Sequence, residues 1–111
     1  MLTEKPVLVD SVSAAENLFI GSRFVGFDGG YCQAGAKAKG VLVTPTRVGE
    51  QAPVGVIGLQ IVEAGGEVLA GDEVQSDATA RAVVLTELGR SNGTAHTSAE
   101  MAGGKILVLL K

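Results

Sequence analysis

Short apolar runs alternate with glycine-rich and polar segments along the whole chain, and this spacing is typical of many short β-strands. The clearest run covers residues 54–62. Its alternation places these residues on one face: Val54, Val56, Gly58, Gln60 and Val62. The opposite face is apolar as well, so we expect this strand at the centre of a sheet or at a subunit interface. Shorter strands are predicted over the following residues: 5–9, 23–27, 31–33, 41–43, 67–69, 73–75, 80–85, 95–98 and 105–110.

The segments between these runs have the residues of tight turns. The chain contains 16 glycines, about twice the usual share, and most of them are scattered between the apolar runs. Asp28-Gly29-Gly30 supplies the positive-φ positions of a hairpin turn, and residues 76–79 are predicted to form another. Residues 34–40 are predicted to be flexible and 48–55 to be loop-like.

Helix is predicted only in small amounts. No window has the 3.6-residue periodicity of an amphipathic helix longer than about three turns. Residues 13–17 could form one helical turn with Ser13 as its cap. Residues 97–104 could form another, with Thr97 or Ser98 as cap.

The length and composition fit one small domain. The chain has 111 residues, of which 46% are hydrophobic, and this suffices for one modest core. It has no internal repeat of solenoid length and no shift in composition that would mark a domain boundary. The sequence therefore predicts one mostly β domain over residues 1–111, with the shape of a small barrel or sandwich.

The charge balance argues against nucleic acid and membrane as partners. The net charge is −3, and no cluster of basic residues could neutralise phosphates. Aromatic residues make up 4% of the chain, too few for a platform that stacks bases. The apolar run 106–110 is far too short to span a bilayer, and the first residues lack a secretory signal pattern. We expect the protein to stay where it is made.

The candidate catalytic groups lack the partners that their chemistry needs. His96 is the only histidine, and no recognisable motif supplies it with a nucleophile and an orienting carboxylate. Cys32 is the only cysteine, which excludes an internal disulfide, and it is better explained as a small buried hydrophobe. Asp72, Glu73 and Asp77 lack the spacing of a calcium loop and are better explained as turn residues. The sequence predicts no catalytic site, no metal and no cofactor.

Two segments of opposite charge could instead serve assembly. The central segment is mildly basic through Lys37, Lys39 and Arg47. The acidic segment has these residues: Glu63, Glu67, Asp72, Glu73 and Asp77. Each is ordinarily a solvated surface, but together they could set the register of a self-complementary assembly.

The order of the motifs from Val54 onwards resembles that of the short tailed-phage proteins known as capsid cement or head decoration proteins. The matching residues are Val62, Ala64-Gly65, Val68, Ala70-Gly71-Asp72, Val74, Ser76-Asp77, Arg81-Ala82, Gly93, Ala95, Ala99, Ala102-Gly103, Ile106, Val108 and Leu110. The resemblance covers about half of the chain. Ala80 and Gly104 depart from it, because glycine and glutamate are usual there, and the segment before Val54 is longer and more aromatic than the family's short N-terminal strand.

The resemblance implies a small single-domain β-barrel or β-tulip-like protein without catalysis. Such a protein binds the outer surface of an icosahedral phage capsid after expansion and stabilises it, commonly as a homotrimer. Its partners would be the major capsid protein and further copies of itself, and its location would be the virion. On this interpretation residues 62–84 are a scaffold of turns whose carboxylates face water.

Two groups of residues are candidates for contact with partners. The first is an extended N-terminal arm, residues 1–12, because a chain end can pair with the strand edge of a neighbour. Its capsid-contact residues would be Leu2, Pro6, Val7, Leu8 and Val9. The second group is Phe19, Phe24 and Phe27, which could form a subunit interface, although core packing is the more common role of phenylalanine.

Three other functions stay open at this point. A tail-tube or head-completion protein would share the need for β-rich assembly. A small β-barrel binding module of the biotinyl-domain type would need a modifiable lysine in a Met-Lys pair, and the chain has no such pair. An enzyme would have to act through His96 or Cys32.

Overall fold

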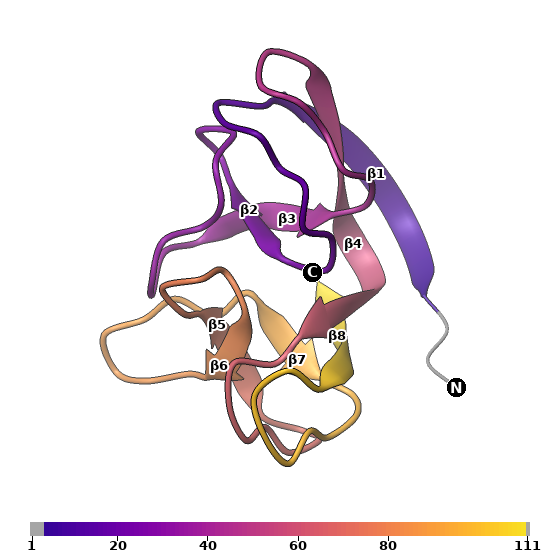
Figure 1. Ribbon diagram of the computed structural model, residues 1–111. Coiled ribbons are helices and arrows are strands. Elements are labelled where there is room, and N and C mark those ends of the chain that lie inside the picture. The colour runs from indigo at the N-terminus through magenta and orange to yellow at the C-terminus, as the bar shows by residue number, and fades with distance from the viewer. Residues whose placement is uncertain (1–3, 111) are drawn as a thin grey trace.

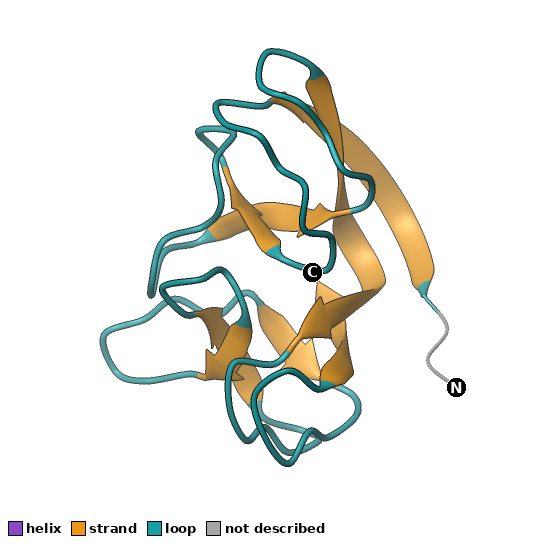
Figure 2. Cartoon of the chain, in the orientation of Figure 1, coloured by secondary structure: helices purple, strands orange, loops and turns teal. Residues whose placement is uncertain are grey.

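The computed structural model describes residues 4–110, which form eight antiparallel strands in one continuous sheet (Figures 1 and 2). The strands are β1 (Lys5–Ser13), β2 (Phe24–Gly26), β3 (Ala38–Leu42), β4 (Gln51–Glu63), β5 (Glu73–Ser76), β6 (Ala82–Val84), β7 (Gly93–Ala95) and β8 (Lys105–Leu110). The sheet curls into a small, nearly closed barrel, and long loops connect the short strands. This confirms the predicted mostly β class and the barrel architecture.

Strand β4 is the centre of the sheet, as its two apolar faces predict. The strand order is β2-β3-β4-β8-β7-β5-β6, and β1 pairs with β4 outside this path. Gly55 of β4 pairs with both Val9 of β1 and Val41 of β3, so β1 and β3 flank β4 on opposite sides. Further along β4, residues 58–63 pair with β8. Strands β3 and β8 therefore lie on the same side of β4 and diverge from each other.

The side chains of β4 alternate as predicted. Val54, Gln60 and Val62 are buried on the inner face, whereas Ile57 is exposed. The core consists of two clusters. The larger one lies among β2, β3, β5, β6, β7, β8 and the second half of β4. The smaller one contains Ala14, Leu18, Val25, Leu42, Ala52 and Val54, and β1 adds only the partly buried Val12 to it.

The predicted helical turns are wrong, because residues 13–17 and 97–104 contain no helix. Ser13 is the last residue of β1 and pairs with Gln51, and the next residue, Ala14, still donates a hydrogen bond to the carbonyl of Glu50. The chain thus continues along β4 and does not begin a helix. In the second segment the backbones of Val68 and Ala99 exchange two hydrogen bonds, which hold the chain extended at that point.

Several strand predictions also differ from the structure: β1 extends to Ser13, and the segments 31–33 and 67–69 contain only isolated bridges, at Tyr31 and Val68. Residues 38–40 are strand and not flexible loop, because β3 pairs with β2 over this stretch. Strand β4 begins at Gln51, inside the segment predicted as loop, because β1 pairs with its first residues. Strand β7 covers residues 93–95 and not 95–98.

The two predicted turns are confirmed. Val25 and Tyr31 bridge across the Asp28-Gly29-Gly30 turn, and Gly29 has a φ of 91°. A side chain at Gly29 would collide with the backbone carbonyl of Ser13, so glycine is needed there on two grounds. The β5–β6 hairpin closes with Ser76 paired to Ala82.

Candidate docking surface

Strand β1 is an edge strand that contributes little to the core. It runs along one outer side of the molecule, and among residues 4–110 it pairs with β4 alone (Figure 1). Val7 is 77% exposed, Leu8 48% and Val9 47%. An exposed apolar edge strand is a template for pairing with another chain and is usually protected unless it has a partner. Strand β1 is therefore the leading candidate for a docking surface.

The pairing of β1 with β4 is irregular at the apolar residues. The register shifts on both sides of Leu8, so Val7 has no partner on β4. Leu8 pairs with Ile57, whose side chain is also exposed, and the two extend the apolar surface onto β4. A bulge of this kind bends a strand and redirects its side chains.

An ion pair holds β1 against the barrel beyond this bulge. Lys39 Nζ lies 3.3 Å from Asp10 Oδ2 and thereby links β3 to β1. The backbone N–H of Ser11 and the ammonium of Lys39 both hydrogen-bond Asp10 and lower the pKa of its carboxyl. The apolar stretch of β1 is thus part of an ordered strand, because it lies between the Glu4–Ile61 contact and this pair.

The structure places the predicted contact residues differently. Val7, Leu8 and Val9 are exposed on β1, whereas Leu2 and the side chain of Pro6 lie outside the described part of the chain. Phe19 and Phe27 are 56% and 65% exposed and can meet a neighbour. Phe24 is fully buried within a single chain and belongs to the core. Spacing alone did not distinguish it from the other two phenylalanines.

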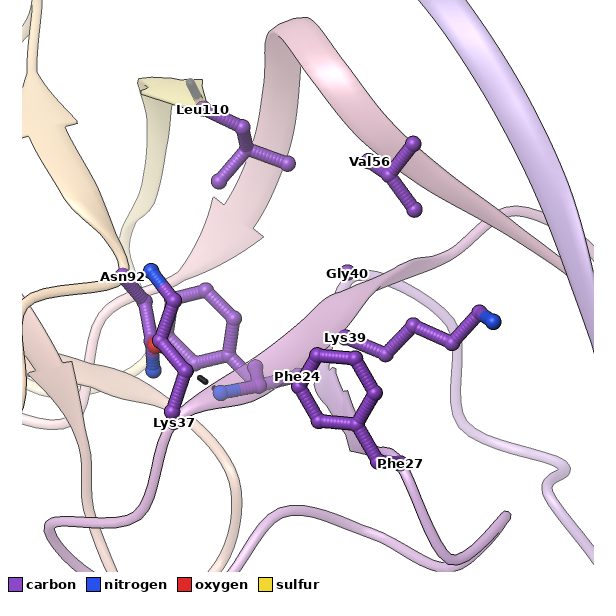
Figure 3. A pocket seen from close by; sticks show the side chains of 9 residues that line it. Phe24, Phe27, Lys37, Lys39, Gly40, Val56, Asn92 and Leu110 are labelled. Carbon is purple, nitrogen blue, oxygen red and sulfur yellow. Dashed lines mark hydrogen bonds between the residues drawn. The ribbon is translucent and has the colours of Figure 1, made fainter.

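A pocket of about 150 Å³ opens beside Phe27, where β3 and β8 diverge from each other alongside β4 (Figure 3). Its apolar wall consists of Phe24, Ala38, Gly40, Val56 and Leu110. Phe27, Lys37, Lys39 and Asn92 complete the lining. Lys39 Nζ lies 6.0 Å from the centre of the Phe27 ring, within the range of a cation–π contact.

Glu63 is the centre of a charged cluster and does not simply face water. Its Oε2 lies 3.3 Å from Arg23 and from Arg81, and its Oε1 lies 3.3 Å from Lys105. Burial raises the pKa of Glu63, but hydrogen bonds from Lys105 and Arg81 and the charge of Arg23 outweigh burial and lower it overall. The cluster joins the end of β4 to the start of β8 and to the β5–β6 turn, so its role is structural.

The carboxylates of residues 72 and 77 hold turns, as predicted. Asp72 Oδ2 accepts a hydrogen bond from the backbone N–H of Leu69. Asp77 Oδ1 accepts hydrogen bonds from the backbone of Thr79 and of Arg81, at 2.8 and 2.9 Å. Such bonds from an aspartate to the backbone of its own turn are a general device of tight turns.

The two side chains considered for catalysis, those of Cys32 and His96, differ in their exposure. Cys32 is buried, and burial raises the pKa of its thiol, which disfavours the nucleophilic thiolate. His96 is exposed. Residues 4–110 contain no group of three or more His, Cys, Asp or Glu side chains that could hold a metal ion. The same part of the chain has no helix long and apolar enough to cross a membrane.

Comparison with solved structures finds the same fold in a phage protein. The crystal structure of the head fiber gp8.5 N base in bacteriophage phi29 is similar to this chain with a TM-score of 0.73. The two sequences are 16% identical, and the similarity covers 94% of this chain and 93% of that one. No curated protein gives a significant match to the sequence.

The sequence also matches the profile of a known protein family. The profile of the phage cement protein family matches residues 5–110, nearly the whole chain. The match includes the first half of the chain, where the resemblance in motifs was weakest. The chain belongs to the phage cement protein family, a family of structural proteins and not of enzymes.

Proposed function

We propose that this chain is a capsid decoration protein, which binds the outer surface of an expanded icosahedral phage capsid and stabilises it. The observation that carries this proposal is the family match over residues 5–110. The similar structure from phi29 is the base of a head fiber, a part of the phage head, and it supports a location on the virion. The major capsid protein would be the principal partner.

The stabilising mechanism follows from binding linkage. A protein that binds only the expanded capsid lowers the free energy of that state and opposes its disassembly. Each copy needs only moderate affinity, because contacts with several capsid subunits and with other copies add avidity. We propose trimers at the threefold positions of the capsid as the assembled form.

Strand β1 is the proposed capsid contact. Its outer edge can accept a strand from the major capsid protein, and Val7, Leu8 and Val9 can be buried in the same contact. The adjacent residues Leu2 and Pro6 would extend the contact towards the N-terminus. Phe19 and Phe27 are proposed for contacts between copies.

Co-sedimentation with empty phage heads tests the proposal. The purified protein is mixed with unexpanded and expanded heads of the same phage, and the bound fraction is measured against concentration. Saturable binding to expanded heads alone is the expected result. Ring-shaped oligomers without binding to either form would instead support a tail-tube or head-completion protein.

A matched pair of variants tests the role of β1. Val7→Asp introduces a charge at a residue that is 77% exposed, so the fold should persist while head binding weakens by at least about tenfold. Met101→Asp changes a residue that is 70% exposed in the loop between β7 and β8, outside β1, and should bind like the wild type. Deletion of residues 1–12 is a less suitable test, because it removes most of β1 and uncovers the edge of β4.

A further inference from the structure

Among residues 4–110, the large apolar side chain with the greatest exposure lies on a hydrogen-bonded turn. Leu88 is 97% exposed in the loop between β6 and β7. The turn before it is fixed by Gln75, whose Oε1 accepts hydrogen bonds from the N–H and the hydroxyl of Thr86, at 2.9 and 3.2 Å. Gly89 N–H closes the turn onto the carbonyl of Thr86, and Arg90 N–H bonds the carbonyl of Gly35. Because these bonds fix the backbone around Leu88, its burial by a partner costs little backbone conformational freedom.

The pocket beside Phe27 has the size to receive such a side chain. Its volume is about 150 Å³. An apolar cavity of about that volume accommodates benzene, which is larger than the four-carbon side chain of leucine. Its apolar wall, defined above, matches an aliphatic occupant, and the two lysines stand at its rim (Figure 3).

The charges around the two features are complementary. Glu87 precedes Leu88 in the turn, and Lys37 lines the pocket. Within residues 4–110, neither Glu87 nor Lys37 belongs to an ion pair, and Lys37 Nζ donates only to the backbone carbonyl of Ser91. Lys39 already pairs with Asp10, so Lys37 is the cation at the rim that remains to meet a carboxylate.

We propose that Leu88 of one copy inserts into the pocket beside Phe27 of a second copy, with Glu87 of the first facing Lys37 of the second. The contact joins two different parts of the same chain's surface, so two copies can make it reciprocally, or several copies can make it in sequence around a ring. The inference rests on the part of the proposed function in which copies assemble with one another. It names the surface and the residue that would connect them, and it gives exposed Phe27 a place at the rim of the contact.

The test measures self-association of the free protein by sedimentation equilibrium from about 1 μM to 1 mM. We expect the wild type to associate reversibly, and Leu88→Asp to weaken association by roughly tenfold to a hundredfold, the value of burying one leucine side chain. Leu69→Asp is the matched control, because Leu69 is also exposed, at 56%, in another loop. Thermal unfolding of each variant verifies that the fold is retained.

A charge exchange between Lys37 and Glu87 tests whether the contact is specific. Lys37→Glu and Glu87→Lys should each weaken association, and the double variant should restore it. A wild type that stays monomeric up to 1 mM would overturn the inference, as would equal association of Leu88→Asp and Leu69→Asp. Head binding is measured separately. A protein that stays monomeric but still binds expanded heads would rule out the Leu88 contact, and the proposed decoration role would stand.

Discussion

Asn92 Oδ1 accepts a hydrogen bond from the backbone N–H of Ala38 at 2.9 Å, although 54 residues separate the two in the sequence. Ala38 opens β3 and pairs with Gly26 of β2, but β3 has already diverged from β4 at this point, so β4 does not pair with it. The side-chain amide of Asn92 also donates to the carbonyl of Ala36 at 3.4 Å. One side chain thus takes the place of a strand at the gap between β3 and the start of β7, and it closes the barrel beside the pocket (Figure 3).

Asn92→Ala should therefore destabilise the protein by about 1–3 kcal/mol, because it leaves a buried backbone N–H without an acceptor. Urea unfolding monitored by circular dichroism gives the free energy of unfolding. Asn17→Ala is the control, since Asn17 Oδ1 also accepts a backbone hydrogen bond, from Val48, but at an exposed position where water can replace it. Equal stability of the two variants would show that Asn92 does not close the barrel.

The charged cluster around Glu63 predicts a loss of stability in acid. The pKa of Glu63 is lower in the folded protein than its ordinary value of 4.5, so the folded state binds fewer protons than the unfolded state. The contribution of Glu63 is therefore complete above about pH 5 and is lost as the pH falls through its folded pKa.

Glu63→Gln isolates this contribution. The variant should be less stable than the wild type at pH 7, by about 1–3 kcal/mol, because hydrogen bonds to a charged group are lost. The difference should shrink as the pH is lowered from 7 towards 3, because the carboxylate of Glu63 in the wild type becomes protonated as the pH falls through its folded pKa. Glu67→Gln, at an exposed position, should show no comparable difference at either pH. A deficit of Glu63→Gln that is as large at pH 3 as at pH 7 would contradict the assigned role of the carboxylate.

A close approach inside β4 predicts a strict need for glycine at position 55. A Cβ atom at Gly55 would collide with the side-chain amide of Gln60, which is itself almost completely buried. Gly55→Ala should thus cost about 1–3 kcal/mol of stability through overpacking. Gly66→Ala should change stability by less, because no atom lies within 4 Å of the Cβ it would add. Thermal unfolding of both variants compares them directly, and equal transition temperatures would show that the Gln60 side chain can move aside.

Strands could be predicted from the sequence wherever the alternation of apolar and polar residues lies within one continuous segment of the chain. Strand β8 was predicted with its observed bounds, and β4 was predicted as a central strand, because alternation of apolar residues is a local pattern. The contacts that organise the surface are not local. Arg23 and Glu63 are 40 residues apart, and Asn92 and Ala38 are 54 apart, so no spacing rule brings them together.

Exposure was the other quantity that the sequence could not supply. Phe24 and Phe27 lie three residues apart with similar neighbours, yet one is fully buried and the other is 65% exposed. The difference arises because Phe24 pairs with Val41 inside the barrel, whereas Phe27 lies in the turn after β2 ends. Family resemblance implied a surface that works through contact, but only the fold shows which apolar residues remain available for it.

The buried thiol of Cys32 gives a further prediction, which distinguishes a structural role of this residue from a catalytic role. Burial raises the pKa of the thiol, and its Sγ lies 3.4 Å from the carbonyl oxygen of Ala36, a geometry that keeps the proton on sulfur. The folded protein at pH 7 should therefore react with a thiol reagent such as Ellman's reagent at least about a hundredfold more slowly than the protein in denaturant, because attack requires the exposed thiolate. The time course of colour development measures both rates. Fast reaction of the folded protein would mean that Cys32 is accessible and ionised, and an enzymatic role for it would then have to be reconsidered.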